Sequence, residues 1–310
     1  MNGLGGVMRS ARTAAGLSLA KMAERAHYSK TLLAYLESGE RTILPEHVRA
    51  YQRVLGVDLE RLAAIAVKPT RVDLASLEHI ASILGATRRL EDTVGPALVR
   101  STVRGLRDLS LAAVHEAGSR LDRSTKSLAS EVSQYLGWLE LANGNGHAAD
   151  QNLDRAVALA EQAQDPDRLF HGLSFKAYTA QFHKRGSEAC DYAEAASQIR
   201  GVHPRLRTYN EYDLARVLAD KGERGAAQRR LVLADRTADA ASVEQPPSSG
   251  YWYTDGFWGL ERGHVLGILG YEEQARKEAE DGFSALPKEH RTTDWAVDLV
   301  KRVQRAVEDR

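Results

Sequence analysis

Throughout the first 68 positions, residues that end helices alternate at short intervals with residues that begin them. Three glycines stand where C-terminal caps belong, and two serines and an aspartate stand where N-caps belong: Gly16, Gly39 and Gly56, then Ser18, Ser29 and Asp58. No run in the chain has the alternation of a strand. The spacing predicts five short helices, over residues 7–15, 19–26, 30–38, 45–55 and 59–66.

The second and third expected helices are joined by only a few residues around His27 and Tyr28. Apolar side chains fall on facing stripes of the two helices, and the small Ala23 lies where their backbones would approach. Two short helices with so brief a connection must cross steeply. Such a crossing is typical of a helix-turn-helix, in which the second helix projects away from the body.

The run MRSARTAAGLSLAKMAERAHYSKTLLAYLESGERTILPEHVRAYQRVLGVDLERL resembles the Cro/repressor-type (xenobiotic-response-element-like) helix-turn-helix family over nearly all of the first 68 residues. The matching motifs are GLS at 16–18, ExG at 37–39 and LGV at 55–57. The resemblance implies that Arg12 pairs with Glu37 as a structural clamp. Two positions depart from the family pattern: His27 replaces the customary turn glycine, and Leu19 replaces a glutamine that contacts DNA.

The resemblance also implies which residues meet DNA. The positions that match the family's base-reading side chains are Ser29, Lys30, Thr31, Ala34 and Tyr35, and those that match its phosphate-positioning sites are Ser18, Ser38 and Arg41. Lysine donates to guanine, threonine offers a hydroxyl and a methyl, and tyrosine reaches a phosphate or packs on a thymine methyl. The alternative is that Lys30 and Tyr35 belong to an ordinary solvated face.

Charge is divided unequally along the chain although the formal net charge is zero. Residues 1–68 hold ten Lys and Arg against six Asp and Glu, a net +4, and the remainder is therefore −4. A basic head on an acidic body suits a chain whose head alone meets a polyanion. Because one small head neutralises few phosphates, we expect two copies on one operator. The sequence thus predicts a homodimer on a pseudo-palindromic operator in double-stranded DNA.

From about residue 126 the chain repeats. A small residue recurs seven positions before a glycine that we expect to end a helix: Gly137 and Gly144, Thr179 and Gly186, Ala215 and Gly222, and Gly263 and Gly270. This spacing describes a helix, a tight turn and a second helix whose backbones approach closely. The segment is similar to tetratricopeptide-type repeats, although no unit matches the pattern fully. An all-α fold is expected, with a helix-turn-helix domain over 1–68 and a tetratricopeptide-like α-solenoid for sensing or dimerisation over 126–310.

Residues 69–125 read as a helical connector of two or three helices, interrupted at Gly95-Pro96. Apolar residues from Leu74 through Leu84 form one stripe. The connector supplies dimer contacts or the first layers of the solenoid, and the sequence leaves both open. With TRRLEDTVGPALV at 87–99 and GWLELANGNGHAA at 137–149, the layout resembles actinomycete regulators with a repressor-type head and a repeat body.

The first helices of a solenoid line its concave wall. The repeat phase places these candidate ligand residues there: Gln134, Trp138, Lys176, Tyr209, Tyr212, Arg216, Phe257 and His264. Aromatic side chains interleaved with cations suit a peptide or a partly apolar small molecule. The alternative is that these aromatic residues only fill gaps between repeats.

Patterns typical of enzymes, metal sites and membrane spans are missing from the sequence. It contains no GxxxxGK, HExxH or GxSxG motif, its ten histidines are scattered, and Cys190 is its single cysteine. No apolar run reaches the length of a membrane-spanning helix. We therefore expect a cytoplasmic protein that is not an enzyme, needs no cofactor and does not meet a membrane.

These observations predict a sequence-specific DNA-binding transcriptional regulator, acting as a repressor and a homodimer, whose repeats sense a peptide or small-molecule signal. The alternative is an interaction scaffold, in which the solenoid binds a partner protein and the head serves mainly for association. The basic head and the group of Lys30, Thr31 and Tyr35 favour DNA. The missing glutamine at Leu19 favours the scaffold.

Overall fold

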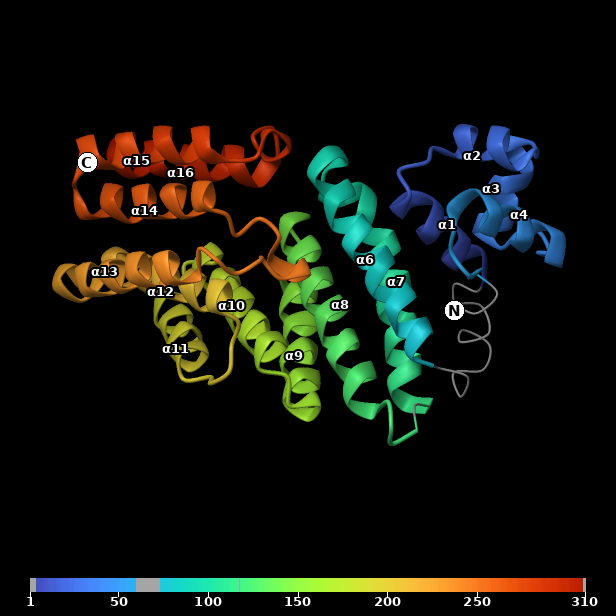
Figure 1. Cartoon of the computed structure of the whole chain (residues 1–310), viewed down its shortest axis with the longest axis horizontal. Helices are drawn as coiled ribbons and strands as arrows, with labels where there is room; N and C mark the ends of the chain where they lie inside the picture. Colours follow the sequence, from blue (N-terminus) through green and yellow to red (C-terminus); the bar gives the residue numbers. More distant parts are fainter. Residues whose placement is uncertain (1–3, 60–72, 117, 309–310) are drawn as a thin grey trace. The chain divides into compact units, whose positions relative to one another are not determined.

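The computed structural model describes residues 4–59, 73–116 and 118–308, and all regular structure within those ranges is helical (Figure 1). The expected all-α fold is therefore confirmed. The chain divides into two compact units, Met1–Asp165 and Pro166–Arg310. The expected segment boundaries after residues 68 and 125 both fall inside the first unit and stay predictions.

The N-terminal helices are α1 (Leu4–Ala14), α2 (Leu19–Ala26), α3 (Lys30–Ser38) and α4 (Pro45–Leu55). The bounds of α2, α3 and α4 are those expected, whereas α1 begins at Leu4 rather than at residue 7. Gly5 lies inside the helix, where it packs closely against α3. A Cβ atom there would lie 2.3 Å from the carbonyl oxygen of Leu36. The helix expected over 59–66 lies outside the described residues, apart from Leu59.

The turn between α2 and α3 is built on His27. This residue has φ 58° and ψ 40°, the left-handed conformation in which the related family uses glycine. Histidine is one of the few non-glycine residues enriched there. Its backbone N–H donates to the carbonyl of Glu24 at 3.3 Å and so ends α2. The expectation that histidine is tolerated at this turn is confirmed.

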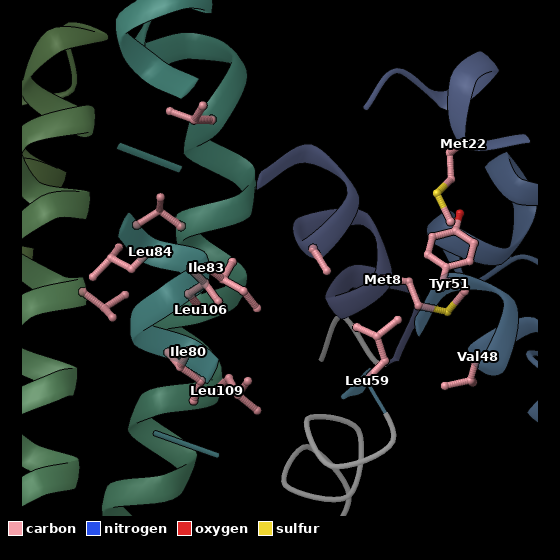
Figure 2. Close-up of a cluster of buried hydrophobic side chains, with 14 of the residues drawn as sticks. Met8, Met22, Val48, Tyr51, Leu59, Ile80, Ile83, Leu84, Leu106 and Leu109 are labelled. Carbon is pink, nitrogen blue, oxygen red and sulfur yellow. The ribbon is translucent and has the colours of Figure 1, made fainter. Parts of the chain in front are cut away.

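Two helix pairs complete the first unit: α6 (Leu74–Val94) with α7 (Pro96–Glu116), and α8 (Asp122–Ala142) with α9 (Gly146–Ala163). Figure 2 shows the buried Ile80, Ile83 and Leu106 between α6 and α7. Because α7 also packs on α8, the connector forms helical layers continuous with the first pair of the expected solenoid. Leu74, which the pattern placed on the buried stripe, is 57% exposed because it is the first residue of α6.

The helix-turn-helix segment rests on the connector within this unit. Helix α1 packs on α6 and α7. The contact with α7 is close at Gly105, where a Cβ atom would lie 3.3 Å from the Ser10 hydroxyl. Met8 and Tyr51 are fully buried in the core of the N-terminal helices (Figure 2).

The second unit consists of three helix pairs and a terminal helix. The pairs are α10 (Pro166–Phe182) with α11 (Gly186–Ser197), α12 (Pro204–Asp220) with α13 (Arg224–Ala241), and α14 (Asp255–Leu269) with α15 (Glu272–Ala285). Helix α16 (Asp294–Glu308) packs on α14 and α15. The paired helices confirm the repeat pattern.

The small residues of that pattern lie where helices touch. A Cβ atom on Gly137 would come within 2.8 Å of the Leu153 side chain, and one on Gly263 within 3.0 Å of the Ala275 carbonyl oxygen. One turn differs from expectation, because Gly186 is the first residue of α11 and does not end α10. Lys184 takes the left-handed conformation there, with φ 58°.

A buried arginine fastens the loop between α13 and α14. The Arg205 guanidinium, on α12, donates to the backbone carbonyls of Glu244 at 2.6 Å, Tyr253 at 2.8 Å and Ser242 at 3.1 Å. The same loop contributes the buried Tyr253, whose ring stacks on Trp258 at 5.3 Å. Arg205 therefore joins the second helix pair of this unit to the third.

Replacement of Arg205 by methionine is expected to destabilise the second unit by about 2–4 kcal/mol, since three carbonyl oxygens lose their donor. The measurement is chemical denaturation of the Trp138→Phe background followed by tryptophan fluorescence, because the remaining tryptophans, Trp252, Trp258 and Trp295, all lie in the second unit. Arg229→Met, at an exposed position of α13, is the matched control and is expected to change stability by less than about 0.5 kcal/mol. Equal denaturation midpoints for the two variants would contradict the role given to Arg205.

Candidate nucleic-acid interface

A buried ion pair sets the position of α3. Arg12, on α1, donates to both carboxylate oxygens of Glu37 on α3, from Nε at 2.6 Å and from Nη2 at 2.7 Å. The third guanidinium nitrogen donates to the Leu17 carbonyl at 2.7 Å. Tyr51, on α4, donates to Glu37 at 2.7 Å. The expected Arg12–Glu37 clamp is confirmed, and it joins α1, α3 and α4.

The phenol of Tyr51 is held in its donor form. Burial, followed by the neighbouring Glu37 carboxylate, raises its pKa. Because the Glu37 side chain is only 5% exposed, its carboxylate depends on the three hydrogen bonds from Arg12 and Tyr51. The clamp thus fixes the angle at which α3 leaves the core.

The outer face of α3 carries most of the candidate base-reading residues. Leu33 and Leu36 are fully buried, so the opposite side of the helix faces solvent. Lys30, Thr31 and Tyr35 are exposed there, and Ala34 is half-buried between them. Tyr35 is 46% exposed. The structure brings these side chains to one surface of one helix.

The serine candidates have structural roles as well. Ser18 caps α2 by accepting from the Lys21 backbone N–H at 3.2 Å, and Ser29 caps α3 by accepting from that of Leu32 at 3.1 Å. The Ser38 hydroxyl donates to the Tyr35 carbonyl at 3.2 Å. All three serines are exposed, so their second hydrogen-bonding positions face solvent. A capped helix start with free N–H groups is a suitable position for a phosphate.

Exposed cations surround this surface. The Arg41 side chain is exposed and pairs with no acid among the described residues. Lys21 and Arg25, one turn apart on α2, are also exposed. They were not among the contact residues predicted from the sequence, although their spacing of four residues within the motif was a signal for them. In DNA-binding proteins, exposed cations of this kind contact the DNA backbone without reading bases.

The candidate ligand residues fall into several environments. Gln134 and Trp138 lie in the first unit, where Gln134 is buried and the Trp138 indole donates to Glu91 at 2.8 Å. In the second unit, the Lys176 ammonium lies 4.6 Å from the centre of the Tyr192 ring. Tyr212 stacks on Trp258 at 5.7 Å and donates to Asp235 at 3.0 Å.

The remaining four candidates, Tyr209, Arg216, Phe257 and His264, lie on α12 and α14 of the second unit. Tyr209 stacks on Tyr253 at 5.2 Å and contacts Phe257 at 6.3 Å. Arg216 donates to Gln181 and to Asp213. Burial, followed by the nearby Arg216, lowers the pKa of His264. Asp213 and Glu261 were not predicted as candidate residues from the sequence, although both lie on the same helical stripes as the candidates.

Residues 4–65 match a family model described as a helix-turn-helix domain. No curated protein matches the sequence. The chain is similar to a crystal structure of nearly identical TPR-like repeats from a protein described as a Podosopora anserina kinesin light chain, with 14% identity, a TM-score of 0.46 and coverage of 78% of this chain and 98% of that chain. It is also similar to Bacillus thuringiensis PlcR in complex with the peptide PapR7 and DNA, with 10% identity, a TM-score of 0.38 and full coverage of both chains.

Within the described part of the chain, none of the helices has both the length and the apolar character needed to cross a membrane. The same residues include no group of three His, Cys, Asp or Glu side chains arranged to hold a metal ion. The family match and the geometry of α2 and α3 define the N-terminal segment as a helix-turn-helix DNA-binding domain. The chain thus places a helix-turn-helix domain before a series of helix pairs.

Proposed function

We propose that this protein is a sequence-specific transcriptional repressor that binds a pseudo-palindromic operator as a homodimer and responds to a peptide or small-molecule signal received by its helical repeats. It acts as a binding protein and not as an enzyme. Its place of action is the bacterial cytoplasm, where operator DNA lies. The observation that carries the proposal is the exposed face of α3, presented by the Arg12–Glu37 clamp.

The chemistry of that face supports base recognition. Lys30 is a donor for the O6 and N7 atoms of guanine, Thr31 combines a hydroxyl with a methyl group, and Tyr35 presents an exposed ring. The capping serines Ser18 and Ser29 place two helix starts toward solvent, where phosphates bind. A helix that only solubilised the protein would need neither the exposed ring nor the buried clamp.

The homodimer follows from the small size of the DNA-binding domain. A single module of this size buries about 600–1,000 Å² on DNA, which is little for specific affinity at physiological salt. Two copies on half-sites one helical turn apart, about 34–36 Å, combine their contacts. Sedimentation of the protein with a duplex selected for binding is expected to give two chains per duplex. A complex of one chain per duplex with unchanged affinity would contradict the dimer.

The repressor assignment and the signal concern how the two units act together. We propose that the signal changes the separation of the two DNA-binding domains, because both recognition helices must enter the major groove at once. A reporter gene placed downstream of the bound site is expected to be expressed less when the protein is present. Raised expression would instead make the protein an activator.

The second candidate function is a protein–protein interaction scaffold. Leu19 favours it, because this residue replaces a glutamine that contacts DNA in the related family, and it is half-buried against the core. In that case the repeats bind a partner protein and the head serves association. The two functions predict different effects of substitutions on the outer face of α3. A DNA-binding regulator loses operator affinity, whereas a scaffold keeps its affinity for the partner protein.

A further inference from the structure

A cluster of charged and polar side chains joins four helices of the second unit. We call it the polar cluster; its members are Tyr178 on α10, Asp213 and Arg216 on α12, Glu261 and His264 on α14, and Arg302 on α16. Arg302 donates to the Tyr178 hydroxyl, and Arg216 donates to Asp213 and to Gln181 of α10. Residues far apart in the sequence are therefore connected through side chains.

The buried part of the polar cluster has more carboxylates than cations. Asp213 is 1% exposed and Glu261 is 8% exposed, whereas Arg216 is their one guanidinium at similar depth within the cluster. Burial raises the pKa of both carboxyl groups, and Arg216 offsets only part of that effect. Arg302, the second arginine of the cluster, lies at its half-buried edge and also acts on Glu261, so Arg216 is the one cation of the cluster at the depth of the two carboxyl groups.

The hydrogen-bonding capacity of this region is also incompletely used. Among the described residues, the second carboxylate oxygen of Asp213 has no partner, and neither does the Gln181 amide nitrogen. Asn210 is 1% exposed and lies one helical turn before Asp213. Its side-chain oxygen and nitrogen also lack a hydrogen-bond partner among the described residues. Arg216 and Arg302 act on the Glu261 carboxylate through their charge. Buried polar groups are normally paired. Here the oxygens Asp213 Oδ2 and Asn210 Oδ1 lack a donor, and the amide nitrogens of Asn210 and Gln181 lack an acceptor.

Arg216 is already committed and does not supply that donor. Its two terminal nitrogens donate to Gln181 and to Asp213. His264 adds no positive charge, because burial, Arg216, Arg302 and Arg305 lower its pKa. Arg302 is committed as well, since it donates to Asp298 and to Tyr178. A donor for the unpaired Asp213 oxygen is therefore sought outside these side chains.

The edge of the polar cluster already holds a cation against an aromatic ring. The Arg302 guanidinium lies 5.2 Å from the centre of the Tyr178 ring. Tyr178 and Arg302 are half-buried, as is Tyr209 next to Asp213, so solvent reaches this edge. Aromatic faces attract guanidinium and ammonium groups. The region thus combines buried acceptors with an accessible aromatic edge.

We propose that the polar cluster binds a ligand through a single guanidinium or ammonium group, which donates to Asp213 and Glu261. The Asn210 amide pairs with a neighbouring carbonyl or N–H of the same ligand. Two sources share this chemistry: a small amine or guanidine metabolite, and a basic side chain of a peptide. This inference rests on the proposed role of the second unit as the receiver of a signal, and it specifies the charge of that signal.

Calorimetric titration of the full chain tests the proposal with three probes. These are n-butylguanidine, the peptide acetyl-Ala-Arg-Ala-amide, and the same peptide with neutral citrulline in place of its arginine. We expect binding of at least one guanidinium probe and at least tenfold weaker binding of the citrulline peptide. Binding of butylguanidine indicates a metabolite, and binding of the arginine peptide alone indicates a peptide signal.

Glu261→Gln is the decisive variant, because it removes the charge, keeps the shape and breaks no hydrogen bond with a described residue. It is expected to lower the affinity for the guanidinium probe by about tenfold or more. Glu280→Gln, at an exposed position of α15, is the matched control and should leave affinity unchanged. Asp213→Asn should also weaken binding, with circular dichroism confirming that the variant is folded.

The proposal is overturned if neither guanidinium probe binds at millimolar concentration, or if Glu261→Gln binds as tightly as Glu280→Gln. Operator affinity, measured with and without the bound probe, separates this inference from the proposed function. Cation binding that leaves operator affinity unchanged would support the cation site and contradict its role in signalling. If no cation bound and a neutral or anionic molecule altered operator affinity, the cation site would be contradicted and the proposed function would stand.

Discussion

Replacement of Glu37 by alanine is expected to destabilise the N-terminal domain by about 3 kcal/mol or more, because it leaves the Arg12 guanidinium without its carboxylate. Arg12 is 12% exposed, so water compensates only part of that loss. The variant also removes the acceptor of the Tyr51 hydroxyl, which is buried in the same core. We expect α3 to lose its fixed angle and DNA binding to fall with it.

Hydrogen exchange of the α1 and α3 amide groups measures this effect locally, since the two units need not unfold together. The control is Glu40→Ala, an exposed glutamate just beyond the end of α3 that forms no ion pair with a described residue. Its amide protection should match that of the original protein. If Glu37→Ala kept the same protection as Glu40→Ala, the clamp would not hold α3 in place.

The double variant Lys30→Ala with Tyr35→Ala is expected to weaken operator binding by about 100-fold or more, since each base contact contributes about 1–3 kcal/mol. Both side chains are exposed and neither belongs to the core, so folding and dimerisation should not change. Fluorescence anisotropy with a selected duplex measures the affinity, and sedimentation measures the dimer. Unchanged affinity would remove α3 from the interface and favour the scaffold.

Arg41→Ala provides a contrast to that double variant. Arg41 offers charge but no base-reading geometry, so its loss should weaken specific and non-specific duplexes to a similar degree. The slope of log affinity against log salt should fall by about one. Different effects on the two duplexes would make Arg41 a base-reading residue.

Local signals in the sequence predict much of the N-terminal domain. Caps such as Ser18, Ser29 and Gly56 act within one helical turn, and they place the bounds of α2, α3 and α4. The Arg12–Glu37 pair spans 25 positions and was expected only from the family resemblance. The start of α1 at Leu4 rather than residue 7 was not predicted, because the close approach of Gly5 to α3 leaves no local signal in the sequence.

Contacts between distant helices were beyond the reach of sequence patterns. Arg205 and its carbonyl acceptors, like Arg302 and Tyr178, meet only because the helix pairs stack as they do. The repeat phase did indicate Tyr209, Arg216 and His264, which the structure places around the polar cluster. It did not indicate Asp213 and Glu261, since acidic residues at helical spacing usually face solvent.

Selection of bound fragments from random DNA with the purified full-length chain, at two salt concentrations, tests the central claim most directly. The exposed face of α3 predicts enrichment of a site with two-fold symmetry whose half-sites are about one helical turn apart. That preference should persist at the higher salt, where attraction to the DNA backbone is weaker. Binding without sequence preference that disappears at the higher salt would contradict a sequence-specific regulator.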